Sequence, residues 1–236
     1  MISVVFPGQG SQKVGMGSDL YNQFEYVKQI FKNADEILGY NISDLILNGP
    51  QEKLNQTTFT QPAIYLIGHA ISEILKKETN FFKNKFCYLA GHSLGEYTAL
   101  TTAETITLEQ GLLLLKSRGE AMQSAVPLGE GGMMAVLGVE TEEIKKLIND
   151  NFKNIECFLA NDNSNGQLIL SGTNTELEKF ALMLKEKNIK NIKLPVSAPF
   201  HCELMRRATL KMEKIINEQK LNEPIYKVVS NVTASE

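Results

Sequence analysis

The 236-residue chain has no tryptophan, and it has only three cysteines and three histidines. The cysteines, Cys87, Cys157 and Cys202, are scattered and form no CxxC pair. This distribution argues against a disulfide framework or a zinc site and favours a reducing compartment. The histidines are equally dispersed, so their spacing gives no metal site. We therefore expect no metal ion.

Long apolar runs and basic blocks are also absent. No apolar run approaches the roughly 18 residues of a membrane span, and the net charge of −3 gives no electrostatic support for nucleic-acid binding. Residues 2–6 enter a β-type run directly, without the basic start of a signal peptide. We expect a cytoplasmic protein with neither a nucleic-acid nor a membrane partner. The apolar fraction of 43% is enough for a substantial core.

One short stretch, Gly91-His92-Ser93-Leu94-Gly95, lies between the apolar residues 86–90 and the helix-prone residues 96–100. A G-x-S-x-G pattern between a strand and a helix is typical of a nucleophile elbow. The sharp turn exposes the Ser93 hydroxyl, and the glycines let strand and helix pass closely. The Leu94 amide would stand at a helix N-terminus, ready to donate to an oxyanion. The alternative is a glycine-rich turn that contains serine by chance, and the strand–helix context favours the elbow.

A serine nucleophile needs a general base, and the chain offers three histidines. His92 is adjacent to Ser93, where neighbouring side chains point apart, so we assign it to packing. His69 lies inside a predicted helix and has no visible partner. His201 follows Pro199, which keeps the chain out of a helix and in a loop. We therefore predict His201 as the general base. No Asp or Glu stands out as the third member of a catalytic triad. A backbone carbonyl could orient the imidazole of His201 instead.

The remaining chain predicts a mixed α/β fold. Residues 4–6 form a strand that ends in a glycine-rich loop, but neither G-x-G-x-x-G nor a P-loop is complete there. Amphipathic helices are predicted for residues 18–38, for a segment starting at Pro62, and for one starting at a Thr107-Leu108-Glu109-Gln110 capping box.

A regular alternation of strand and helix patterns follows over residues 133–194. The order β-α-β-β-α-β is that of a ferredoxin-like unit. We predict a small subdomain at 129–196, inserted into a core formed by 1–128 and 197–236. Two such subdomains would leave a cleft between them, which is a favoured place for a substrate.

Four motifs follow one another in chain order: Phe6-Pro7-Gly8-Gln9-Gly10-Ser11-Gln12, Gly91-His92-Ser93-Leu94-Gly95-Glu96-Tyr97, Ser117-Arg118-Gly119 and Ala198-Pro199-Phe200-His201. Together they resemble the malonyl-CoA:acyl-carrier-protein transacylase family of fatty acid synthesis. The resemblance runs from residue 2 to about residue 234. It implies an α/β-hydrolase-like core that carries the ferredoxin-like subdomain.

The resemblance also implies a role for each site residue. Ser93 would carry the acyl group, and His201 would be its base. The backbone amides of Gln9 and Leu94 would form the oxyanion hole, and Arg118 would hold the malonyl carboxylate. The implied partners are malonyl-CoA and an acyl carrier protein, and no cofactor is needed.

Family members continue past the last residue of this sequence, and the further segment normally contributes core packing and the carbonyl that orients the histidine. We therefore expect the C-terminal part of the core to be missing here. Two other functions stay open. A serine hydrolase or thioesterase shares G-x-S-x-G, but it usually places an acidic residue between serine and histidine in chain order. An inactive carrier-protein-binding fragment is the third possibility.

Overall fold

The computed structural model describes residues 2–83, 87–127, 129–151, 156–196 and 198–236. The chain forms two compact units, one made of Met1–Glu120 with Lys214–Glu236 and the other of Ala121–Glu213. Helices and strands occur in both units, which confirms the predicted mixed α/β class. No helix in the described ranges is long and apolar enough to cross a membrane.

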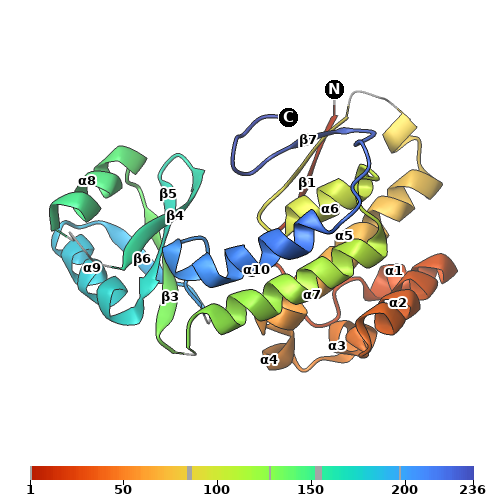
Figure 1. Ribbon diagram of the computed structural model, residues 1–236, viewed down its shortest axis with the longest axis horizontal. Helices are drawn as coiled ribbons and strands as arrows, with labels where there is room; N and C mark the ends of the chain where they lie inside the picture. Colours follow the sequence, from red (N-terminus) through yellow and green to blue (C-terminus); the bar gives the residue numbers. More distant parts are fainter. Residues whose placement is uncertain (1, 84–86, 128, 152–155, 197) are drawn as a thin grey trace. The chain divides into compact units, whose positions relative to one another are not determined.

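The first unit contains a three-stranded parallel sheet with β2 (Cys87–Gly91) at its centre. One neighbour is β1 (Ile2–Phe6), and the other is β7 (Lys227–Val229) near the end of the chain (Figure 1). Because Phe6 pairs with Gly91, the loop after β1 and the loop after β2 start at the same edge of the sheet.

The helices of the first unit differ from the prediction in two places. The helix predicted over 18–38 is interrupted at Phe24, whose extended dihedral angles separate α1 from α2. Gly39, in the left-handed region, ends α2. Pro62 does not start a helix: α5 begins five residues earlier, so Pro62 removes one N–H donor from its interior. The elements are α1 (Ser18–Gln23), α2 (Glu25–Leu38), α3 (Ile42–Asn48), α4 (Gln51–Leu54), α5 (Thr57–Glu78), the 3-10 turn η1 (Phe81–Lys83), α6 (Gly95–Thr102) and α7 (Leu108–Ala125).

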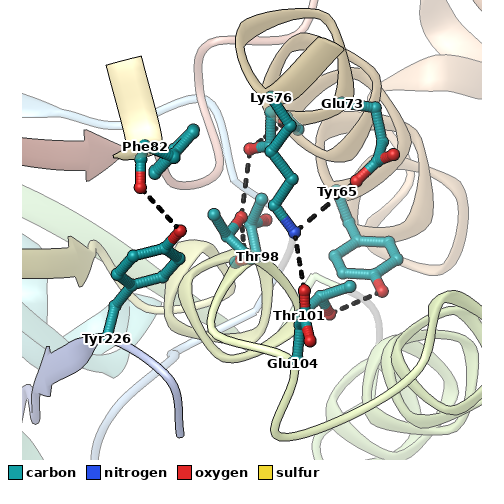
Figure 2. A network of polar contacts seen from close by, with 11 residues as sticks. Tyr65, Glu73, Lys76, Phe82, Thr98, Thr101, Glu104 and Tyr226 are labelled. Carbon is teal, nitrogen blue, oxygen red and sulfur yellow. Dashed lines mark hydrogen bonds and ion pairs between the residues drawn. The ribbon is translucent and has the colours of Figure 1, made fainter. Parts of the chain in front are cut away.

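Polar contacts join α5 to α6, the helix that follows the predicted elbow (Figure 2). The hydroxyl of Tyr65, whose side chain is fully buried, lies 2.8 Å from that of Thr101. Lys76 forms ion pairs with Glu73 at 3.6 Å and with Glu104, just beyond α6, at 3.5 Å. These contacts add to the apolar packing and fix α6 against the long helix α5.

The second unit contains a four-stranded antiparallel sheet in the order β4-β5-β3-β6. In chain order its elements are β3, α8, β4, β5, α9 and β6, which is the predicted alternation. A 3-10 turn, η2 (Glu203–Met205), and α10 (Arg206–Asn217) follow. The bounds are β3 (Gly131–Leu137), α8 (Thr141–Asn151), β4 (Cys157–Ser164), β5 (Gln167–Thr173), α9 (Asn174–Glu186) and β6 (Lys190–Lys193).

Both faces of this second sheet are covered. Met134 and Val136 of β3 pack with residues of α8 and α9, including Ile144 and Phe180. The alternate residue Met133 packs instead with a second cluster, which includes residues from the loop and helix that follow β6. The continuous burial of β3 follows from this two-sided cover.

Candidate active site

The predicted elbow is a tight turn between β2 and α6. Ser93 adopts a left-handed backbone conformation with φ of 53°, which is uncommon for any residue except glycine. The His92 N–H donates to the Phe6 carbonyl at 2.9 Å, and the Gly95 N–H donates to the His92 carbonyl at 2.9 Å. Strained backbone of this kind persists where the surrounding structure enforces it, and it clusters at functional sites.

The glycines on either side of Ser93 are needed for close backbone approach. A Cβ on Gly91 would overlap the backbone of Gly95, and a Cβ on Gly95 would overlap the Phe6 carbonyl. Gly8, in the loop after β1, would likewise meet the ring and carbonyl of His92. These positions pack the elbow directly against the end of β1.

The two predicted oxyanion-hole residues lie in these adjoining loops. Gln9 is in the turn after β1, and its side-chain amide donates to the Thr57 hydroxyl at 3.2 Å. Leu94 is the N-cap residue of α6 and is buried. The N–H groups at the start of a helix have no intrahelical partner, so this end of α6 favours negative charge.

Arg118 reaches the candidate nucleophile from α7. Its Nη2 donates to the Ser93 Oγ at 3.0 Å, and its Nη1 donates to the Gln61 Oε1 at 2.6 Å. Burial lowers the pKa of Arg118, while nearby Tyr97 and Glu96 act in the opposite direction. Because a guanidinium stays protonated in proteins, the group beside Ser93 is a largely desolvated cation with a fork of N–H donors.

Gly119 explains how α7 comes so near to α5. A Cβ at this position would lie 2.8 Å from the Thr57 carbonyl oxygen and 2.8 Å from the Thr58 Cα. The missing side chain lets the two helices approach and places Arg118 beside Gln61. Sequence reasoning missed Gln61, which stands among threonines at the start of α5 and carries no local signal of its own.

Asn231 is a second residue that the sequence did not single out. It follows β7 by two positions, and its side-chain Oδ1 accepts from the Ser93 backbone N–H at 2.7 Å. Its Nδ2 donates to the Gly91 carbonyl at 2.5 Å, and its own N–H donates to Glu96 at 3.0 Å. One asparagine thus contacts both sides of the elbow and the first turn of α6.

His201, the predicted base, belongs to the second unit. It too has a left-handed backbone, with φ of 58°. The buried Ser171 hydroxyl donates to the carbonyl of the preceding Phe200 at 2.5 Å, and the Cys202 thiol donates to the Pro199 carbonyl at 3.1 Å. The loop that carries His201 is therefore fastened to β5.

The other two histidines differ in environment. His69 lies in α5 with its ring stacked near that of Tyr65, and burial lowers its pKa to about 4. His92 is exposed on the elbow beside Gly8. Within the described ranges, no three acidic, histidine or cysteine side chains gather as a metal site would require.

Comparison with known proteins places this arrangement in a family. Residues 4–236 match the family model described as the acyl transferase domain. This chain belongs to the acyl transferase family. A polyketide biosynthesis malonyl CoA-acyl carrier protein transacylase of Bacillus subtilis, PksC, is 41% identical over 99% of this chain and 78% of its own. The malonyl CoA-acyl carrier protein transacylase of Escherichia coli K12 is 36% identical over 97% of this chain and 73% of its own.

Solved structures agree with the sequence relatives. An acyl carrier protein S-malonyltransferase from Vibrio cholerae superposes with a TM-score of 0.92 at 40% identity, covering 99% of this acyl transferase and 76% of that protein. The malonyl-transacylase PlMCAT, solved with its type II polyketide acyl-carrier protein AntF, gives a TM-score of 0.92 at 35% identity, with coverages of 99% and 75%. The malonyl-transacylase resemblance predicted from four motifs is confirmed.

Proposed function

We propose that this acyl transferase moves a malonyl group from malonyl-CoA to the phosphopantetheine thiol of an acyl carrier protein, through a malonyl ester on Ser93. One observation carries the choice of acyl group: the Arg118 guanidinium lies 3.0 Å from the Ser93 hydroxyl. Malonyl has a free carboxylate and acetyl has none, so a cation beside the acylated oxygen favours malonyl. A guanidinium fork matches a carboxylate through two parallel hydrogen bonds.

In the first half-reaction, the Ser93 Oγ attacks the thioester carbon of malonyl-CoA while His201 takes the hydroxyl proton. The carbonyl oxygen becomes an oxyanion, which accepts hydrogen bonds from the backbone amides of Gln9 and Leu94. Removing one such donor typically costs about 3 kcal/mol. The carbon–sulfur bond then breaks, and CoA leaves with the proton that His201 held.

In the second half-reaction, His201 takes the proton of the carrier protein's thiol, and the sulfur attacks the malonyl-Ser93 carbonyl. The same two amides hold the second oxyanion. The ester bond breaks, and the Ser93 oxygen recovers its proton from His201. The cycle is ping-pong, because CoA departs before the carrier thiol reacts.

We also propose that the core, 1–128 with 197–236, is α/β-hydrolase-like and that 129–196 is a ferredoxin-like subdomain. The parallel sheet with an elbow between β2 and α6 supports the first assignment. The antiparallel order β4-β5-β3-β6 supports the second, because it is the strand order of a split βαβ unit. The predicted cytoplasmic location stays a prediction.

The test is intact-mass spectrometry after incubation with malonyl-CoA. The parent protein should gain one malonyl increment, and Ser93→Ala should gain none. Ser124→Ala is the matched control, because Ser124 is an exposed serine whose hydroxyl donates to the Ala121 carbonyl in its own helix. A malonyl increment that persists in Ser93→Ala would refute the assignment.

Adding a phosphopantetheine thiol to the malonyl-enzyme separates the two other functions. Transfer to the thiol faster than release of free malonate supports the transacylase. Faster hydrolysis would indicate a serine hydrolase or thioesterase. A parent protein that accepts no acyl group at all would indicate a carrier-protein-binding domain without activity.

A further inference from the structure

Asn231 holds the elbow from the side opposite to β1. It lies two positions after β7, whose Val229 pairs with Ala90 in β2. Where the backbone pairing of β7 with β2 ends, the Asn231 side chain continues it: Nδ2 donates to the Gly91 carbonyl, and Oδ1 accepts from the Ser93 N–H. The side-chain amide thus acts like one more peptide group of the neighbouring strand.

These two bonds fix the peptide groups on both sides of His92. The Gly91 carbonyl precedes His92, and the Ser93 N–H follows it, so neither peptide plane can rotate without losing a bond to Asn231. The Asn231 N–H also donates to the Glu96 carboxylate at 3.0 Å, which ties the same residue to the first turn of α6. The left-handed φ of Ser93 is held between these attachments.

We propose that Asn231 is a positioning residue that holds Ser93 and the Leu94 amide in reactive geometry. The inference rests on the proposed role of Ser93 as nucleophile. Asn231 itself touches no reacting atom. Its amide fixes the backbone from which the Ser93 hydroxyl and the oxyanion-binding N–H of Leu94 project. Displacing a reacting group by about 1 Å can lower a rate by roughly 100-fold.

The chemistry requires a donor and an acceptor in one short side chain. Alanine supplies neither. Aspartate has the same shape but, when ionised, only accepts, so one of its oxygens would face the Gly91 carbonyl without a proton between them. Protonated aspartate carries one O–H donor and one acceptor and restores both bonds. The variant Asn231→Asp should therefore behave like asparagine only at low pH.

The experiment measures the single-turnover rate of malonyl-enzyme formation for the parent, Asn231→Ala and Asn231→Asp in the full chain. At neutral pH both variants should acylate roughly 100-fold more slowly than the parent. The malonyl-CoA concentration for half-maximal rate should change by less than about threefold, because the Arg118 contact to substrate remains. Asn222→Ala is the matched control: Asn222 precedes β7, and its side chain donates to the Glu104 carbonyl at 3.3 Å, away from the elbow.

The pH dependence separates positioning from a general loss of stability. The rate ratio of Asn231→Asp to the parent should rise at least tenfold as the pH falls toward the carboxyl pKa, which is about 4 in model peptides. The carboxylate of Glu96 faces the position from α6 and would raise that pKa further. Dividing by the parent rate removes the titration of the general base, which both proteins share.

Two outcomes would overturn the proposal. One is acylation at the parent rate in Asn231→Ala. The other is a pH-independent ratio for Asn231→Asp while its thermal unfolding matches that of Asn222→Ala. If the parent protein itself forms no malonyl-Ser93, the proposed function is refuted instead. The acylation measurement on the parent protein detects this outcome. If Asn231→Ala fails to fold, the isosteric Asn231→Asp still decides the question.

Discussion

Removing the Arg118 side chain should change which acyl group the enzyme accepts. The guanidinium is bonded to Gln61 at 2.6 Å and to Ser93 at 3.0 Å, and it lies 5.9 Å from the centre of the Tyr97 ring. Losing one member of a buried charge pair typically costs about 2–5 kcal/mol. Since 1.4 kcal/mol is tenfold, Arg118→Ala should lower kcat/KM for malonyl-CoA between roughly 30-fold and several thousand-fold.

Acetyl-CoA provides the internal comparison, because it has no carboxylate to pair with Arg118. Its kcat/KM should change little in Arg118→Ala. Arg118→Lys keeps the charge but not the fork of donors, so it should recover only part of the malonyl activity. Lys116→Ala is the control on the same helix: the Lys116 ammonium donates to the Leu38 carbonyl at 3.0 Å, and its removal should leave the malonyl-to-acetyl ratio unchanged.

The assay must separate selectivity from folding. Arg118→Ala also removes a hydrogen bond from the buried Gln61, which can cost about 1–3 kcal/mol of unfolding free energy. Urea unfolding of each variant measures this loss directly. Partial unfolding would lower the activities with malonyl-CoA and with acetyl-CoA by the same factor. An equal loss for malonyl-CoA and acetyl-CoA would therefore mean that Arg118 supports the fold and does not select the acyl group.

Two further predictions concern histidines. His201→Ala should acylate about 100-fold to 10,000-fold more slowly in single-turnover mass spectrometry, as expected for a lost general base, while still binding CoA; acylation at the parent rate would place the base elsewhere. Burial lowers the pKa of His69 to about 4, against the opposing effect of Glu73, so the unfolded chain takes up a proton first as the pH falls below about 6.5. The free energy of unfolding should therefore decrease as the pH falls from 6.5 to 4, and His69→Gln should show a weaker dependence on pH over this range. The same pH dependence in the parent and in His69→Gln would contradict this reasoning.

Local signals in the sequence predicted local structure well. The capping box is the clearest case. The Thr107 N–H donates to the Gln110 side chain at 2.9 Å, and the Gln110 N–H donates to the Thr107 hydroxyl at 3.1 Å. Both partners lie within one turn, so the sequence contains all the information that the contact needs. The strand–turn–helix context of Ser93 is local in the same way.

Contacts between remote segments were not predictable. Phe24 interrupts a helix whose apolar periodicity runs on without a break, and α5 extends through Pro62 because surrounding helices bury its first turns. Gln61 matters only because α7 crosses at Gly119. Asn231 is 138 residues from Ser93 in the chain, and no single-sequence pattern links two such positions.

The position of β2 between β1 and β7 also bears on the order of folding. The strand before Ser93 pairs on one side with residues 2–6 and on the other with residues 227–229. During synthesis, the ribosome must add more than a hundred further residues after Ser93 before β7 and Asn231 exist. Contacts between segments so far apart form slowly, because a long loop must close before they stabilise the chain. Helices such as α5 can form early, whereas the turn that shapes the nucleophile is completed only when β7 and Asn231 arrive.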